Sequence, residues 1–294
     1  MIRNHINHLI ITIGVVSVSF AAIFIRLAEA PPLIIATYRL LIASLILWPI
    51  TLAHSRNELG RLTRRDILLA FISGIFLAFH FGLWISSLSY TSVATSVILV
   101  TASPLFVAIA SFVFFKERVS WKVITGIIIC FFGAAFIGYG NWSLGSDSFL
   151  GGALALLGAL TVAGYLLIGR RLRQTMGLLV YGSLTCSSAA LLLLIASLIW
   201  RYPLFGYTSH TYLMMILLAV VPQLLGHLSL NWSLRYVSAT LITIAVLGEP
   251  VGANLLAYFI LGEVPKVFEI YGSIFILVGI FIAFRRNSEA PLHQ

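Results

Sequence analysis

The feature that most constrains this chain is a series of long apolar stretches, separated by short segments that carry nearly all of its charge. Each stretch holds roughly 18 to 24 residues, enough for a helix to cross the hydrocarbon core of a bilayer. Of the 294 residues, 60% are hydrophobic and 9% are charged, whereas soluble domains carry about 25% charged residues. A β-barrel would show short alternating segments instead. The sequence therefore predicts an all-α polytopic membrane protein.

We expect ten transmembrane helices with both termini in the cytoplasm. The expected spans are residues 8–25, 33–53, 67–89, 93–115, 121–140, 150–169, 177–199, 211–234, 237–261 and 267–284. In this arrangement fourteen of the 18 Lys and Arg residues lie inside, three lie outside, and Arg39 lies within a span. The inside residues are Arg3, Arg56, Arg61, Arg64, Arg65, Lys116, Arg118, Lys122, Arg170, Arg171, Arg173, Arg235, Arg285 and Arg286. Such an excess is what the positive-inside rule predicts.

An internal repeat appears when the sequence is moved along itself by about 146 residues. "YTSVATSVILVTASPLF" then aligns with "YVSATLITIAVLGEPVG", and the aligned pairs include Pro104–Pro250, Glu117–Glu263, Gly126–Gly272 and Gly133–Gly279. Each repeat, 1–140 and 141–294, holds five spans, so the second must insert upside down relative to the first. Inverted repeats are a device of transporters, in which two halves exchange shapes around a central site.

Pro104 and Pro250 lie about halfway along equivalent spans, where each removes a backbone donor and should kink its helix at the midplane. The residue before each proline is pushed away from helical geometry. That residue is Ser103 in one repeat and Glu249 in the other. Both repeats are therefore predicted to kink at this proline, but only the second repeat has a carboxylate beside it.

Two segments resemble a known family: "ASPLFVAIASFVFFKERVSWKVITGIIICFFGAAF" and "LGEPVGANLLAYFILGEVPKVFEIYGSIFILVGIFIAF". They are similar to the two EamA domains of the drug/metabolite transporter superfamily, and the resemblance covers nearly the whole chain. It implies a ten-helix inverted repeat, a central cavity, and export or exchange of metabolites, amino acids or drugs. It does not imply a particular substrate.

Polar residues inside the spans are the candidate binding residues, because each is expensive to place in a membrane. Gln223, His227 and Asn231 recur every four residues and should share one helix face. We interpret this stripe as the lining of a cavity; the alternative is interhelical hydrogen bonding. In the third span, His80 lies within one residue of the repeat equivalent of His227, so the two imidazoles could face each other across the pseudo-axis.

Four further residues complete the candidate site. Trp84, one turn after His80, could stack on an aromatic or cationic cargo or simply fill an interface. Arg39, next to Tyr38, is the one basic residue well inside a span, and Glu249 is the one acidic residue there. The two could form a permanent ion pair, or a pair that opens so that Glu249 takes a proton or a substrate amine. Tyr38 is counted among the substrate-binding candidates, whereas Glu263 should cap a helix or pair with a loop base.

The leading hypothesis is a secondary or facilitative inner-membrane transporter that exports a small metabolite such as an amino acid or amine. The alternative is efflux of drugs or hydrophobic cations by proton antiport. An integral-membrane enzyme on lipid-linked substrates is a remote alternative, because no nucleophile or metal motif such as HExxH or GxSxG occurs. No cofactor, metal or nucleic acid is expected, and the protein would act among membrane lipids as a monomer or homodimer.

Overall fold

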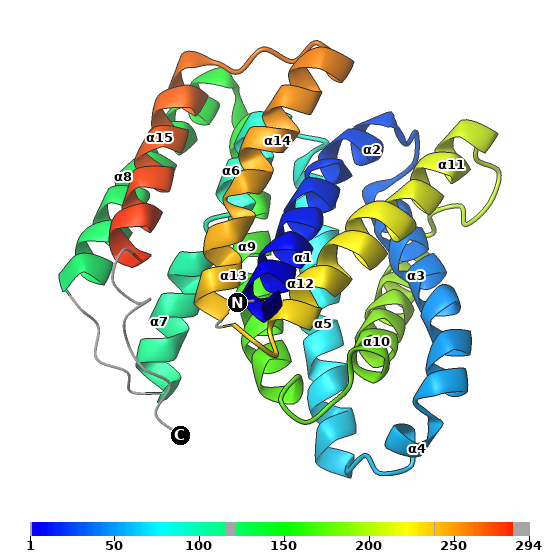
Figure 1. The fold of residues 1–294 in the computed structure, drawn as a ribbon. Coiled ribbons are helices and arrows are strands. Elements are labelled where there is room, and N and C mark those ends of the chain that lie inside the picture. Colours follow the sequence, from blue (N-terminus) through cyan, green and yellow to red (C-terminus); the bar gives the residue numbers. More distant parts are fainter. Residues whose placement is uncertain (1, 116–120, 238, 285–294) are drawn as a thin grey trace.

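A computed structural model of the protein describes residues 2–115, 121–237 and 239–284 (Figure 1). Within these ranges all regular secondary structure is helical. Eight helical segments are long and apolar enough to cross a membrane: Leu9–Leu27, Pro32–His54, Arg64–Ser87, Val93–Ala110, Ile124–Leu144, Ser146–Leu172, Leu178–Ile199 and Ser209–Ser233. The protein is therefore built as a multi-pass membrane protein, and these eight segments coincide with the first eight expected spans.

The last two expected spans are helical but differ in character. Residues 237–261 are divided into α13 (Ala239–Val246), α14 (Gly248–Leu256) and the π-helix η2 (Ala257–Leu261). Residues 267–284 form the apolar helix α15 (Val267–Phe284). That both cross the membrane stays a prediction.

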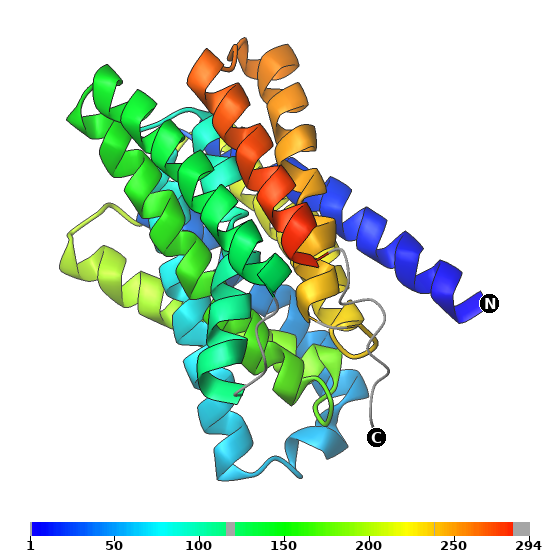
Figure 2. The ribbon, with the colours of Figure 1, turned by 90° about the vertical axis from the view of Figure 1, so that its left-hand side faces the viewer.

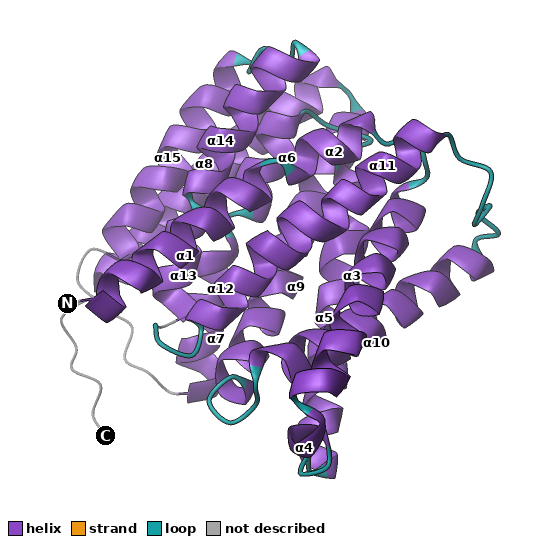
Figure 3. Cartoon of the chain, turned by 45° about the vertical axis from the view of Figure 1, so that its right-hand side comes forward, coloured by secondary structure: helices purple, strands orange, loops and turns teal. Residues whose placement is uncertain are grey.

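The remaining helices follow the chain in an almost unbroken series. They are α1 (Ile2–Ser19), α2 (Ala21–Leu27), α3 (Pro32–His54), α4 (Arg56–Leu59), α5 (Arg64–Ser87), α6 (Val93–Val100), α7 (Ser103–Phe115), α8 (Trp121–Leu144), α9 (Ser146–Leu172), α10 (Leu178–Ile199), α11 (Ser209–Leu218), the π-helix η1 (Ala219–His227) and α12 (Leu228–Ser233). Figure 3 shows that the loops between the helices gather at two opposite ends. We call the end that carries α4 the lower end, and the end at which α2 and α14 finish the upper end, as they lie in Figure 1.

The helices form a bundle in which α5 packs on α9, α3 on α10, and α8 on α15 (Figures 1 and 2). A large apolar core joins α2, α3, α5, α9 and α10 around residues such as Ile34, Leu40, Leu77 and Tyr181. Because many large side chains outside this core are exposed, for example Phe131 and Phe259, the bundle presents an apolar surface suited to lipid.

Helices α8 and α15 cross through glycines. A Cβ placed on Gly133 would lie 2.8 Å from the carbonyl oxygen of Gly272, and one on Gly279 would lie 2.7 Å from that of Gly126. Between them the Cys130 thiol donates to the Ile276 carbonyl oxygen at 3.3 Å. Small residues allow this close approach, as at many helix contacts in membranes.

The fourth and ninth expected spans are both interrupted just before their prolines. α6 ends at Val100 and α7 begins at Ser103, while α13 ends at Val246 and α14 begins at Gly248. Each first segment packs on the second segment of the other span, α6 on α14 and α13 on α7. The two breaks therefore lie in a shared region of the bundle, where backbone regularity is lost on both sides.

Basic residues at the ends of the helices favour the lower end. Arg56, Arg61, Arg64, Arg65, Lys122, Arg170, Arg171, Arg173 and Arg235 belong to lower-end connections, and Arg26, Arg201 and Lys266 belong to upper-end ones. Lys116, Glu117, Arg118, Arg285 and Arg286 lie outside the described residues.

Candidate functional site

A small cavity of about 60 Å³ lies between the two interrupted spans. It is lined by Val18, Ala21, His80, Trp84, Val100, Thr101, Ser103, Val162, Tyr165, Leu166, His227, Leu230, Asn231, Ile242, Val246 and Glu249. Both halves of the chain contribute, and residues on either side of both helix breaks are among them. Its volume suits a few water molecules or one small polar group, well short of the roughly 300 Å³ at which ligand pockets begin.

Two histidines from different halves meet at this cavity. The ring of His80 on α5 lies 6.4 Å from the ring of His227 on η1 and is stacked on Trp84 at 6.0 Å. The Nδ1 atom of His80 lies 3.0 Å from the Gly158 carbonyl oxygen. Because a carbonyl oxygen can only accept, Nδ1 carries the proton and Nε2 is left as an acceptor. The imidazole therefore offers a lone pair rather than a proton.

Two other buried polar groups that belong to cavity-lining side chains have no hydrogen-bond partner among the residues that the structure describes. They are the indole Nε1 of Trp84 and the amide Oδ1 of Asn231, on side chains that are 3% and 4% exposed. The Asn231 amide nitrogen donates to the Tyr165 hydroxyl at 2.5 Å, and its backbone oxygen accepts from Arg173 at 3.1 Å, so the side chain is firmly held. Buried polar groups are nearly always hydrogen-bonded, and each exception requires an explanation. A donor and an acceptor left free in one cavity are what a polar ligand or water would satisfy.

Glu249, in the first turn of α14, is buried and lines the cavity. Neither carboxylate oxygen has a hydrogen bond or ion pair within the described part of the chain. Arg39 is fully buried nearby, with Nε donating to the Gln223 oxygen at 3.1 Å and its guanidinium carbon 3.9 Å above the Phe81 ring. The two terminal nitrogens of Arg39 have no hydrogen-bond partner in the described ranges of the chain. Arg39 and Glu249 thus form no ion pair in this conformation; the ion pair found among the described residues joins Arg26 and Glu263.

Gln223 and Tyr38 do not line the cavity. Gln223 lies within the π-helix η1, four residues before His227. Its side chain bonds Arg39 instead, while His227 and Asn231 reach the cavity. The Tyr38 hydroxyl donates to the Leu204 carbonyl oxygen at 2.8 Å, which ties α3 to the loop before α11.

Several cavity residues were absent from the sequence-based candidates. Thr101 and Ser103 lie beside Pro104, so the proline that predicted the kink could also have indicated them. Tyr165 offers no such signal, because an aromatic residue in an apolar run is typical of an ordinary core. In the described ranges no group of three or more His, Cys, Asp or Glu residues could hold a metal ion.

Helices long enough to cross a bilayer, arranged around a small internal cavity, define the class: a multi-pass membrane protein. The sequence pattern of the EamA-like transporter family matches residues 5–139 and again 149–285. The chain belongs to this family, and the protein is a membrane transporter.

Similar proteins carry names of the same kind. An uncharacterized transporter of Clostridium kluyveri is 24% identical over 85% of this chain and 82% of its own length. One of Archaeoglobus fulgidus is 25% identical over 95% and 98%, and the uncharacterized transporter YxxF of Bacillus subtilis is 25% identical over 86% and 81%. A solved crystal structure covers 95% of this chain and 97% of its own with a TM-score of 0.68 at 17% identity, so it shares the fold.

Proposed function

We propose that this protein is a secondary or facilitative transporter that exports a small metabolite, such as an amino acid or amine, by alternating access around the central cavity. The observation that carries the proposal is the set of buried groups without partners there: Trp84 Nε1, Asn231 Oδ1 and the Glu249 carboxylate. A cavity of about 60 Å³ is too small for most metabolites. The cargo must therefore enter in a different arrangement of the helices.

The proposed architecture has ten spans in two inverted repeats, 1–140 and 141–294, with both termini in the cytoplasm of the cell that bears the protein in its inner membrane. Three observations support it. The family pattern matches twice, the two helix breaks lie at equivalent positions, and the α8–α15 contact is reciprocal under an offset of 146 residues. The concentration of basic residues at the lower end supports a cytoplasmic location for that end.

The chemistry of the cavity favours a cargo with N–H donors. Glu249, Asn231 Oδ1 and His80 Nε2 can accept hydrogen bonds, whereas Trp84 Nε1 is a buried donor without a partner among the described residues. The Ser103 hydroxyl and the His227 ring, which also line the cavity, can donate as well. An ammonium group fits the acceptors, and a neighbouring oxygen fits the indole. The alternative, efflux of hydrophobic cations in exchange for protons, draws on the same carboxylate and on the Trp84 ring face. The two differ in whether the cargo needs an oxygen beside its cation.

Solute accumulation tests the proposal. Cells that express the protein would be loaded with a panel of amino acids, amines and cationic dyes, and retention would be compared with cells that express Asn231→Leu. We expect faster loss of at least one small amine or amino acid with the wild type, and slower loss with the variant at equal expression. Retention that never differs from empty cells across the panel would contradict the proposal.

Topology is tested separately by thiol labelling. A cysteine at Ser146, the first residue of α9 at the upper end, should react with an impermeant reagent added to intact cells. One at Ser55, between α3 and α4 at the lower end, should not. Reversed labelling would overturn the orientation, and equal labelling would indicate mixed insertion.

A further inference from the structure

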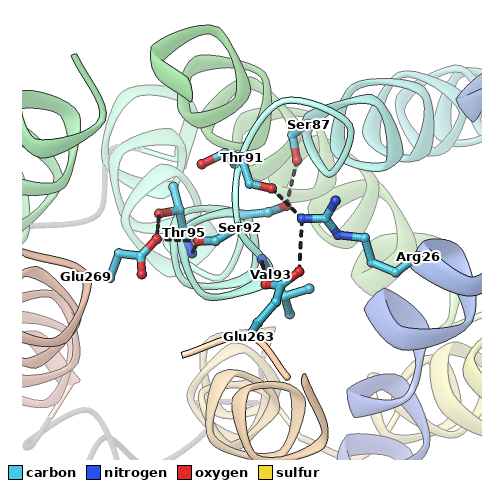
Figure 4. Close-up of polar contacts among 9 residues, drawn as sticks. Arg26, Ser87, Thr91, Ser92, Val93, Thr95, Glu263 and Glu269 are labelled. Atoms are coloured by element: carbon cyan, nitrogen blue, oxygen red, sulfur yellow. Dashed lines mark hydrogen bonds and ion pairs between the residues drawn. The ribbon is translucent and has the colours of Figure 1, made fainter. Parts of the chain in front are cut away.

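A cluster of paired polar groups joins the two halves of the chain at the upper end, well away from the cavity. We call it the rim cluster: the side chains of Arg26, Ser92, Thr95, Glu263 and Glu269, with the backbone of Thr91, Val93 and Lys266 (Figure 4). Arg26 lies in the last turn of α2, and Ser92 and Thr95 lie at the beginning of α6; both helices belong to the first half of the chain. Glu263 and Glu269 follow η2 and open α15 in the second.

Every carboxylate oxygen in the rim cluster has a hydrogen-bond or ion-pair partner. Glu263 faces Arg26 Nη2 at 3.1 Å with one oxygen and accepts from the Val93 backbone at 2.9 Å with the other. Glu269, which is 2% exposed, accepts from the hydroxyls of Ser92 and Thr95 and, at 2.6 Å, from the Lys266 backbone. Two acidic residues of one half thus hold the beginning of a helix in the other, where the helix dipole and free N–H groups favour negative charge.

Arg26 extends the cluster to a third element. The same Nη2 donates to the Thr91 carbonyl oxygen at 2.8 Å, so the end of α2, the turn before α6 and the loop before α15 meet at one guanidinium (Figure 4). The side chains of Arg26 and Glu263 are 30% and 28% exposed. The contact is therefore reachable by water and can be exchanged at small cost.

The elements held at the rim also line the cavity. Ala21 on α2, Val100 at the end of α6 and Glu249 at the start of α14 are all lining residues. A short hydrogen-bonded path also runs inward: Ser96 on α6 bonds Ser87 at 2.6 Å, and Ser87 donates to the Trp84 carbonyl oxygen at 2.6 Å. Separation of α6 from α14 at the rim would widen the space between them down to the cavity.

We propose that the rim cluster is a lock that closes the cavity toward the upper end and must open once in each transport cycle. The proposal rests on the transport function proposed above and adds which contacts break. The alternative is a permanent structural contact, here called a staple, in which the same residues stay bonded throughout the transport cycle.

Alkylation of a cavity cysteine tests the lock without any cargo. In a Cys130→Ala/Cys186→Ala background, Ser103→Cys places a thiol in the cavity lining. A sulfonated maleimide would be applied to intact cells and to inside-out vesicles. Glu263→Gln should raise the alkylation rate from the upper side by roughly two- to fivefold, the scale expected for loss of one partly exposed ion pair.

Glu58→Gln is the matched control, because Glu58 also caps a helix of the other half, accepting from the Gly177 backbone, but at the lower end. It should leave the upper-side rate unchanged. An unchanged rate with Glu263→Gln, or an equal rise with Glu58→Gln, would overturn the lock.

Cross-linking provides the second test, using whichever solute the accumulation screen identifies. Ala94 and Val264 line a small space of about 10 Å³ inside the rim cluster. Joining Ala94→Cys to Val264→Cys with a short bifunctional maleimide should stop transport, while a monofunctional maleimide on the same variant should not. Transport that continues in the cross-linked protein would identify a staple. If no solute is ever transported the proposed function fails, but the alkylation result still decides whether the rim opens.

Discussion

The rim cluster and the central cavity both concentrate polar side chains in a largely apolar protein, yet they satisfy them differently. At the rim, the four carboxylate oxygens of Glu263 and Glu269 each have a donor from the protein. In the cavity, Glu249, Trp84 Nε1 and Asn231 Oδ1 have none in the described part of the chain. A buried polar residue in a membrane therefore does not by itself indicate binding. The proposed binding residues differ from those of the rim in that they lack partners among the described residues and line a cavity.

The largest effect should follow removal of a fully paired carboxylate. Glu269→Ala would leave the two hydroxyls of Ser92 and Thr95 and the Lys266 N–H without an acceptor, at 2% exposure. We expect the free energy of unfolding in detergent to fall by about 3 kcal/mol. Glu58→Ala, which frees one backbone N–H in a more exposed place, should cost about 1 kcal/mol. Equal losses of unfolding free energy in the two variants would show that the fully paired carboxylate of Glu269 contributes no more to stability than that of Glu58.

In contrast to Glu269→Ala, the variant Glu249→Gln should lose transport and keep its stability. Because Glu249 has no hydrogen-bond or ion-pair partner among the described residues, we expect the melting temperature to stay near that of the wild type. Transport in proteoliposomes should fall by about tenfold, the scale of one charge-assisted hydrogen bond to the cargo, and any pH dependence should disappear. A folded variant with unchanged rate and pH profile would contradict a binding role. A strongly destabilised one would show that the carboxylate balances Arg39 after all.

The smallest effect is expected for Trp84→Phe, which keeps an aromatic ring and removes the unpartnered N–H. The apparent affinity for the cargo should weaken by roughly two- to tenfold, as for one neutral hydrogen bond. The free energy of unfolding should change by less than about 1.5 kcal/mol, because only packing is altered. Competition between the cargo and an analogue that lacks its oxygen distinguishes hydrogen bonding by the indole N–H from packing of the ring. If the N–H binds the oxygen, the wild type should prefer the cargo and Trp84→Phe should bind both compounds alike.

Much of the helix pattern was predictable because hydrophobicity and length decide which segments can cross a bilayer. The eight clearest spans are confirmed, and the prediction that Glu263 caps a helix or pairs with a base is confirmed in both forms. Proline marked the region of the two helix breaks, since the loss of one backbone donor is a local property of the residue.

What sequence spacing could not supply was the group that each polar side chain reaches. Gln223 shares a four-residue spacing with His227, but its side chain bonds Arg39 and does not line the cavity. Partner choice was equally hidden: Arg39 and Glu249 looked complementary as the charges within spans, whereas the structure pairs Arg26 with Glu263 instead. Such choices depend on distances between helices that no local pattern encodes.

The close contact of α8 with α15 through glycines suggests how the chain evolved. Gly133 meets Gly272 as Gly279 meets Gly126, so one surface is used twice, as in a symmetric dimer. Under the proposed repeat, an ancestral five-helix protein that inserted in both orientations would already have bound its own copy through this surface. Fusion of two such genes needed no new contact at this crossing. Divergence of the two copies would then leave Ser103 before the proline in one half and Glu249 before it in the other.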